Sequence, residues 1–92
     1  MSRPISTENK FRALAHITRR RVVELLQRRP MTAGDLAQHF THSRAVLSKH
    51  LRILEGTGLI VFQRKGVNLE YRLVPGSFES LRQWIVRVPV AA

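Results

Sequence analysis

The sequence predicts a small, mainly α-helical domain with one β-hairpin, in the order of four helices, two strands and a last helix. Apolar residues recur at helical spacing along most of the chain, as expected for helices with one buried face. Residues 59–74 instead carry strand-forming residues on both sides of a glycine-containing loop. Because the chain has 92 residues and no internal repeat, we expect a single domain, 1–92.

The first two predicted helices are short and lie close together in the chain. Ser6 or Thr7 is expected to cap the first helix. Thr18 is the stronger cap and is expected to open the second. Ile17 and Val22 have the spacing of a hydrophobic staple, which would fix the direction in which the chain enters this helix.

The third and fourth predicted helices, within about residues 32–56, are separated by a turn of about three residues. Thr32 and Asp35 have the spacing of a capping box at the start of the third helix. Ser43 is expected to cap the fourth helix. The buried face of this fourth helix should contain Leu47, Leu51 and Leu54. Two helices joined in this way form a helix-turn-helix.

A hairpin and one more helix complete the chain. The predicted strands flank a loop at residues 65–68 and would form a wing over about residues 59–74. Pro75 and Gly76 interrupt the chain before a last helix begins at Phe78. The sequence therefore predicts a winged helix-turn-helix domain.

The charge of the chain indicates a polyanionic partner. Sixteen Lys and Arg residues against six Asp and Glu residues give a net charge of +10. Because the basic residues cluster, double-stranded DNA or another nucleic acid is favoured over a basic surface that serves only solubility. The chain has no cysteine, which excludes disulfides, thiol nucleophiles and cysteine-based zinc sites. No apolar run is long enough to span a membrane and no signal peptide is evident, so we expect a cytoplasmic protein with no membrane partner.

The face of the fourth helix opposite its leucines combines basic and small side chains. Small side chains let a helix approach the floor of the DNA major groove, and Arg or Lys can reach guanine O6 and N7. For any single residue, a solvated helix face is the alternative. The DNA contacts expected from this helix are Ser43, Arg44, Ala45, Val46, Ser48, Lys49 and Arg52.

The tip of the predicted wing is also basic. Arg64, Lys65 and Asn68 lie where they could reach backbone phosphates or the adjacent minor groove. The alternative is that these residues are polar only because hairpin tips commonly are. We expect them to contact DNA.

Three consecutive arginines stand near the start of the second predicted helix. Arg19, Arg20 and Arg21 oppose the helix dipole, at a cost of roughly 0.3–1 kcal/mol each at low salt. Phosphate binding would remove this conflict. Ion pairs with Glu24 or Glu55 would also reduce it, and the sequence leaves both explanations open.

Several segments together have a recognisable form. The chain contains TRRRVVELL at residues 18–26, DLA at 35–37 and LSKHLRIL at 47–54. With the hairpin that follows, they resemble the ArsR/SmtB family of winged-helix repressors over about residues 11–73. The resemblance implies a homodimeric transcriptional repressor that binds an imperfect inverted repeat. It also implies that His50 contacts the DNA backbone or a neighbouring helix.

The resemblance further implies that the first and last helices, about residues 5–15 and 78–88, form the dimer interface. The apolar surface of the last helix is too broad for a small monomer to hide easily, although packing within one chain is the alternative. A two-fold dimer would place its two recognition helices about 34 Å apart, one turn of DNA. The expected dimer contacts are Phe11, Leu14, Phe78, Leu81, Trp84, Ile85 and Val88.

The metal sites of the family have no counterpart in this sequence. Many members bind metal through Cys-x-Cys on the helix that here begins after Thr32, and others through Asp and His on the last helix, which here contains neither. His39 and His42 straddle a turn and need not share a face. We therefore expect no metal site and no cofactor, as in the metal-site-lacking, SdpR-like branch of the family.

The sequence also bears on two other classes of function. A winged-helix module for protein docking or nonspecific nucleic-acid binding remains an alternative, because several arginines lie outside the predicted DNA-facing elements. These are Arg28, Arg29, Arg82 and Arg87. Catalysis is not expected, because the chain has no paired carboxylates near a histidine and no phosphate-binding glycine loop after a strand. Ser48 and His50 point in different directions on a helix and do not form a nucleophile and base.

Overall fold

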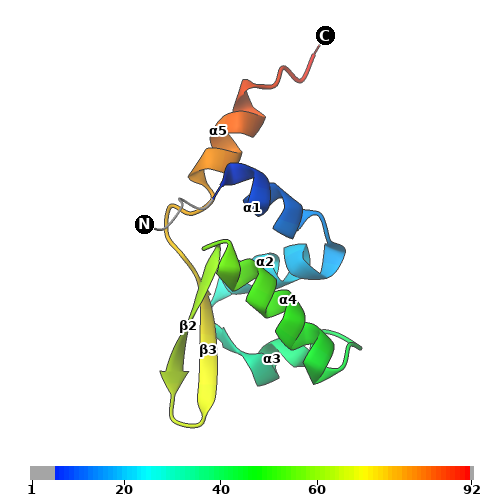
Figure 1. Cartoon of the computed structure of the whole chain (residues 1–92), viewed down its shortest axis with the longest axis vertical. Coiled ribbons are helices and arrows are strands. Elements are labelled where there is room, and N and C mark those ends of the chain that lie inside the picture. Colours follow the sequence, from blue (N-terminus) through cyan, green and yellow to red (C-terminus); the bar gives the residue numbers. More distant parts are fainter. Residues whose placement is uncertain (1–5, 92) are drawn as a thin grey trace.

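A computed structural model describes residues 6–91 and has the predicted mainly helical architecture with a hairpin (Figure 1). The described elements are α1 (Thr7–Leu14), α2 (Ile17–Arg28), β1 (Met31–Thr32), α3 (Ala33–Ala37), α4 (Arg44–Gly56), β2 (Ile60–Lys65), β3 (Asn68–Leu73) and α5 (Glu79–Arg87). Position 5, where the first helix was expected to begin, lies outside the described residues. None of the described helices is long and apolar enough to cross a lipid bilayer.

The hydrophobic core forms where α2, α3 and α4 meet the small sheet. The most deeply buried large side chains are Val22, Leu25, Leu36, Leu47, Leu51, Leu54, Leu59 and Ile60. The three leucines of α4 are 0–1% exposed, so the predicted buried face of this helix is confirmed. Burying one such side chain stabilises the fold by roughly 1.5–3 kcal/mol. This packing fixes which face of α4 remains in solvent.

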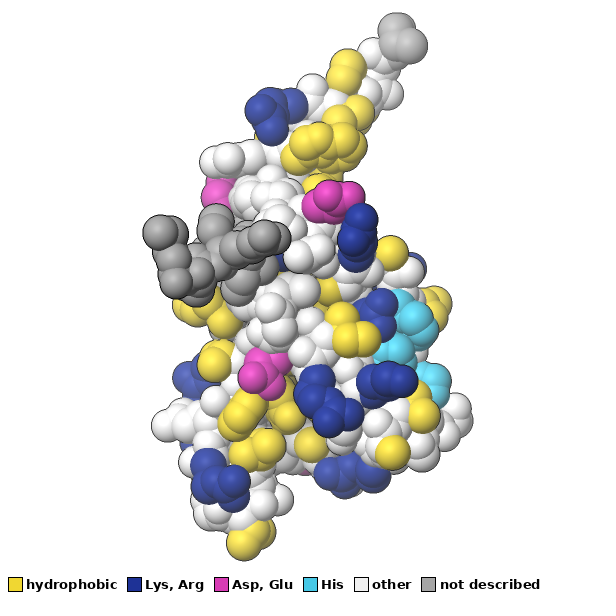
Figure 2. Space-filling view, viewed as in Figure 1, with side chains coloured by type: hydrophobic (Ala, Val, Ile, Leu, Met, Phe, Trp, Pro, Cys, Tyr) yellow, Lys and Arg dark blue, Asp and Glu magenta, His cyan; other side chains and the backbone are white. Residues whose placement is uncertain are grey.

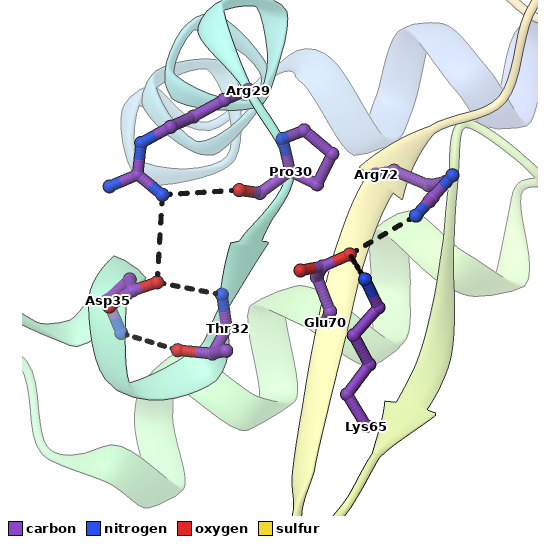
Figure 3. Close-up of polar contacts among 7 residues, drawn as sticks. All are labelled: Arg29, Pro30, Thr32, Asp35, Lys65, Glu70 and Arg72. Carbon is purple, nitrogen blue, oxygen red and sulfur yellow. Dashed lines mark hydrogen bonds and ion pairs between the residues drawn. The ribbon is translucent and has the colours of Figure 1, made fainter.

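Helix caps in the helix-turn-helix follow the predictions. The hydroxyl of Thr32 accepts from the backbone N–H of Asp35 (3.0 Å), and the Asp35 carboxylate accepts from the N–H of Thr32 (3.2 Å), as Figure 3 shows. Ser43 Oγ accepts from the N–H of Val46 at the start of α4 (3.1 Å). These bonds satisfy N–H groups that have no partner inside the helix, so they define where α3 and α4 begin. Ser6 caps α1 in the same way.

The start of α2 differs from the prediction. His16 caps this helix, because its Nδ1 accepts from the N–H of Thr18 at 3.1 Å. Thr18 therefore lies inside the first turn, is 5% exposed, and its hydroxyl is 2.8 Å from Nε2 of His42. Ile17 is 73% exposed, so the predicted staple with buried Val22 is wrong. Because the imidazole nitrogen of His16 satisfies the free N–H of Thr18, the helix begins at Ile17, one residue before Thr18.

The wing is part of a three-stranded antiparallel sheet in the order β1-β3-β2. The sequence did not indicate β1, which pairs Met31 with Tyr71. The predicted loop at residues 65–68 is shorter in the structure, because Lys65 and Asn68 form the last cross-strand pair. The turn is then only Gly66 and Val67, and Gly66 has φ +62°. A two-residue hairpin turn requires this left-handed conformation, which glycine adopts without strain.

Helices α1 and α5 lie together at one end of the molecule, while α3 and the hairpin tip lie at the other (Figure 1). The ring of Phe11 in α1 meets the ring of Trp84 in α5 edge to face, with centroids 5.5 Å apart. Lys10 Nζ donates to the carbonyl of Ser77 just before α5 (2.7 Å). The last helix is therefore held to the first.

Replacement of Leu51 by Ala should lower the free energy of unfolding by about 2–5 kcal/mol, because it leaves a cavity in the core beneath α4. The matched control is Ile53→Ala on the same helix, where the side chain is 40% exposed. The control should change stability by less than about 1 kcal/mol. Urea unfolding followed by circular dichroism measures both, and equal losses for the two variants would contradict this account of the core.

Candidate nucleic-acid interface

The outer face of α4 is a basic surface in solvent. Its members, all exposed, are Arg44, Ala45, Val46, Ser48, Lys49 and Arg52, together with the capping residue Ser43. Figure 2 shows Lys and Arg side chains gathered over α4, with histidine side chains at the edge of the group. The leucines on the opposite face are buried, so packing forces these polar side chains outward. We call this set the α4 surface.

His50 is placed differently from the α4 surface. It is half-buried and faces α2, where Arg19 Nη1 lies 3.1 Å from its Nδ1. Of the two contacts that the resemblance implied for this residue, the structure shows the one with a neighbouring helix. Burial, together with the positive charge of Arg19 and Lys49 and the nearby His16 and His42, lowers the pKa of His50 below its ordinary value of 6.5.

Three of the four histidines lie near one another. The ring centroids of His16 and His50 are 4.5 Å apart, and those of His42 and His50 are 5.9 Å apart. We call these three residues the histidine cluster. His39 is exposed in the turn after α3. Among residues 6–91, no group of three or more His, Cys, Asp or Glu side chains has an arrangement that could hold a metal ion.

The consecutive arginines at the start of α2 have a role that sequence reasoning missed. Arg19 Nε donates to the carbonyl of Ala13 (2.6 Å), and Arg20 Nη1 donates to the carbonyl of Leu14 (2.7 Å). Both guanidinium groups therefore satisfy free carbonyls at the C-terminal end of α1, where the helix dipole favours cations. The two-residue connection between α1 and α2 was the signal in the sequence, because it brings one helix end against the next helix start.

The remaining arginine of this run, Arg21, forms one of the ion pairs that the sequence left open. Arg21 Nη1 lies 3.6 Å from the Glu24 carboxylate, one turn further along α2. Both side chains are substantially exposed, so this pair adds little stability. Glu55, the other predicted partner, takes no part in the contacts of the three arginines.

The wing carries one exposed cation, Arg64, and two cations that share a carboxylate. Lys65 Nζ and Arg72 Nη2 lie 3.2 Å and 3.1 Å from the same oxygen of Glu70 (Figure 3). Two hydrogen bonds lower the pKa of Glu70: the one from Lys65 has the larger effect, and the one from Arg72 adds to it. Arg64 and Asn68 are exposed. Glu70 was not singled out in the sequence, because only the pairing of β2 with β3 brings it to Lys65.

The arginines outside the predicted DNA-facing elements are mostly engaged within the chain. Arg29 lies 3.7 Å from Asp35 and donates to the carbonyl of Pro30. Arg82 pairs with Glu79 at 2.8 Å, and Arg87 donates to the carbonyl of Gln83. These contacts give three of the four arginines a local structural role and remove much of the motivation for an adaptor function.

An apolar surface extends along α5. Trp84, Ile85 and Val88 are 53%, 56% and 46% exposed, which is high for large apolar side chains. Phe11, Leu14 and Phe78 are half-buried beside them. Leu81, also predicted as a dimer contact, is different: it is 4% exposed and packs into the core of its own chain. We call the six residues other than Leu81 the α1/α5 surface.

The comparisons with known proteins agree with this geometry. Residues 16–61, from the cap of α2 into β2, match the family described as bacterial regulatory protein, arsR family. The chain is 37% identical to transcriptional repressor SdpR of Bacillus subtilis over 78 residues, which is 85% of this chain and 87% of SdpR. It is 35% identical to HTH-type transcriptional regulator Rv2034 of Mycobacterium tuberculosis over 82 residues, covering 89% of this chain and 77% of that regulator.

The fold is found in a solved relative as well. The crystal structure of a possible transcriptional regulator for arsenical resistance superimposes with a TM-score of 0.80 at 37% identity, covering 86% of this chain and 82% of that one. The described architecture is therefore a winged helix-turn-helix, in which α3 and α4 precede the hairpin. By sequence match, by identity to two regulators and by fold, this chain belongs to the ArsR family of bacterial regulatory proteins.

Proposed function

We propose that this chain is a homodimeric, DNA-binding transcriptional repressor that recognises an inverted-repeat operator without a metal cofactor. The observation that carries the proposal is the α4 surface, which is basic, exposed and formed on a helix whose other face is fixed in the core. A rigid helix with small residues near its start fits the major groove. The similarity to SdpR, which is a transcriptional repressor, supports repression as the direction of regulation.

The residues of α4 have distinct roles in this proposal. Arg44 and Lys49 read base edges, where a cation can bind guanine O6 and N7. Ala45 leaves room for the helix to approach the groove. Ser43 Oγ already accepts from Val46, so its own O–H remains available to donate to a phosphate.

The wing contributes contacts to the DNA backbone. Arg64 and Asn68 lie exposed at the hairpin tip and can reach a phosphate or the adjacent minor groove. Lys65 is shared with Glu70, so only part of its charge is available to DNA. We assign the wing a role in affinity and orientation rather than in sequence reading.

Dimerisation through the α1/α5 surface supplies the second half-site contact. A two-fold interface would cover the exposed rings and aliphatic side chains of α5, which a monomer leaves in water. Two copies of α4 would then face successive major grooves on one side of the duplex.

Metal independence is supported by what the side chains of α3 do. The Asp35 carboxylate accepts from the N–H of Thr32 and lies near Arg29, so it is committed to capping. Ala33 and Gly34 beside it offer no ligand atoms in their side chains. The function proposed here is binding, with no catalytic step.

The direct test is a titration of purified protein against the DNA just upstream of its own coding sequence, beside a scrambled duplex of equal length. Chelator is present throughout, and two salt concentrations are used. Specific recognition should separate the two duplexes by about 10³-fold or more at fixed salt, and both affinities should fall as salt rises. Equal binding to both duplexes there, and again in a genome-wide selection of binding sites, would reject an operator-binding repressor and favour the adaptor alternative.

Variants of the recognition helix extend the same titration. Arg44→Ala or Lys49→Ala should remove about 1–3 kcal/mol of discrimination between operator and scrambled DNA, because each loses a base contact. Arg28→Ala is the matched control, since it removes the same charge from an exposed position on α2. If both α4 variants discriminate as well as the control does, α4 does not read the sequence.

Replacement of Glu70 by Gln should strengthen binding to either duplex at low salt. The change frees Lys65 and Arg72 for phosphates, so the slope of log affinity against log salt should steepen by about 0.9 per added contact. Glu79→Gln removes an equal charge on α5 and should leave the slope unchanged. An unchanged slope in the Glu70 variant would mean that the wing stays clear of the DNA backbone.

Replacement of Ile85 by Glu should convert the dimer to a monomer, because it places a carboxylate in the centre of the apolar interface. Operator affinity should fall with it, since each half-site would be bound separately. Ile17→Glu is the control, because Ile17 is 73% exposed at the start of α2 and is not part of the α1/α5 surface. Analytical ultracentrifugation measures both, and a dimeric Ile85 variant would exclude the α1/α5 surface as the interface.

A further inference from the structure

One side chain connects three helices of this fold. Arg19 lies half-buried in the first turn of α2. Its Nε donates to the carbonyl of Ala13 at the end of α1 (2.6 Å), and its Nη1 lies 3.1 Å from Nδ1 of His50 in α4. The rigid guanidinium plane therefore fixes a helix of the α1/α5 surface and the recognition helix relative to each other.

The chemistry of this contact determines the protonation state of His50. A guanidinium group has only donors, so Nδ1 of His50 must be the acceptor. The imidazole is then neutral, with its proton on Nε2. A second proton would have to occupy Nδ1, directly toward Arg19, which would break the hydrogen bond and bring two cations together.

The surroundings of His50 oppose that second proton from every side. His16 approaches from the segment before α2, His42 from the loop before α4, and Arg19 from α2 itself. Lys49 adjoins His50 on its own helix. Together with burial, these neighbours disfavour a proton on His50 and lower its pKa.

His16 carries the same requirement at the neighbouring helix start. Its Nδ1 accepts from the N–H of Thr18, so the cap of α2 also depends on an unprotonated nitrogen. A proton on that nitrogen would leave the N–H of Thr18 without its partner and add a cation beside Arg19. The corner between α1, α2 and α4 is thus held by two imidazole acceptors.

We propose that Arg19 and His50 are positioning residues that fix the recognition helix relative to the dimerising helix, and that proton uptake by His50 releases this link and weakens operator binding. The inference rests on the proposed function in assigning DNA reading to α4 and dimerisation to α1. In a dimer, the link sets how the two copies of α4 are spaced and oriented, which determines their fit to successive grooves.

The sign of the pH dependence follows from the lowered pKa of His50. Well above pH 6.5 the residue is neutral in both folded and unfolded chains, and the link is intact. As the pH falls below 6.5, the unfolded chain takes up the proton first, so the link loses its contribution to stability. The loss is complete once the pH has passed below the lowered pKa of the folded chain.

The first test uses the protein without DNA. NMR follows the imidazole Cε1–H resonance of His50 and the backbone amides of α4 from pH 8 to 5 in the wild type and in Arg19→Met. The midpoint of His50 should lie below 6.5 in the wild type and should rise in the variant, because a neighbouring cation is gone. The α4 amides should shift with the same midpoint as His50. An identical midpoint in both proteins, or α4 amides that do not follow it, would overturn the link.

The second test measures binding to a duplex that the wild-type protein itself selects from a random-sequence pool at pH 8. From pH 8 to 5, the wild type should lose about tenfold more affinity than His50→Gln, which cannot take up the proton. His39→Gln is the matched control and should behave as the wild type, since His39 lies outside the histidine cluster. Arg19→Met should also flatten the pH profile.

Two results would overturn the proposal in this second test. One is an equal pH dependence in the wild type and His50→Gln. The other is wild-type binding that tightens in acid relative to the variant, because a protonated His50 would then be a phosphate contact. If the pool yields no preferred sequence, the proposed function fails instead, and the resonances of His50 and α4 still decide whether the link exists.

Discussion

The burial of one face of α4 is the constraint on which the rest of the molecule depends. Leu47, Leu51 and Leu54 are almost completely removed from water, so the rotation of the helix about its own axis is fixed. Every residue of the α4 surface points outward as a consequence. A chain of this size buries a limited core, and most of that core packs a single basic helix, α4, against α2, α3 and the sheet.

Local signals in the sequence predicted much of the fold, and nonlocal pairing explains what they missed. Ser43 and the pair of Thr32 and Asp35 lie within one turn of the N–H groups that they satisfy, so their spacing alone predicted the starts of α4 and α3. The helical spacing of Leu47, Leu51 and Leu54 likewise predicted which residues of α4 are exposed. The strand β1 has only two residues and exists because β3 pairs with it, so no local pattern marks it.

In the candidate site, too, local features were predicted from the sequence and nonlocal contacts were not. The basic residues of α4 and of the wing tip were found from the sequence, and the structure places them in solvent. The contacts that modify them were not found, because Glu70 reaches Lys65 across the hairpin and Arg19 reaches His50 across two helices. His16 was missed as a cap because histidine is less common there than threonine, and Thr18 offered the usual residue two positions later.

The two-residue turn of the wing limits the insertions that the hairpin can accept. Tyr71 faces the core and pairs with Phe62, while Glu70 pairs with Gln63 on the other face of the sheet. The pair that flanks a two-residue turn exchanges both backbone hydrogen bonds, and such pairs alternate with non-hydrogen-bonded pairs along an antiparallel ladder. A wing that keeps this turn and these faces can therefore lengthen only by two residues on each strand, a step of about 6.6 Å. Relatives with a longer wing and the same turn should differ from this chain by insertions of four residues, placed symmetrically about Gly66 and Val67.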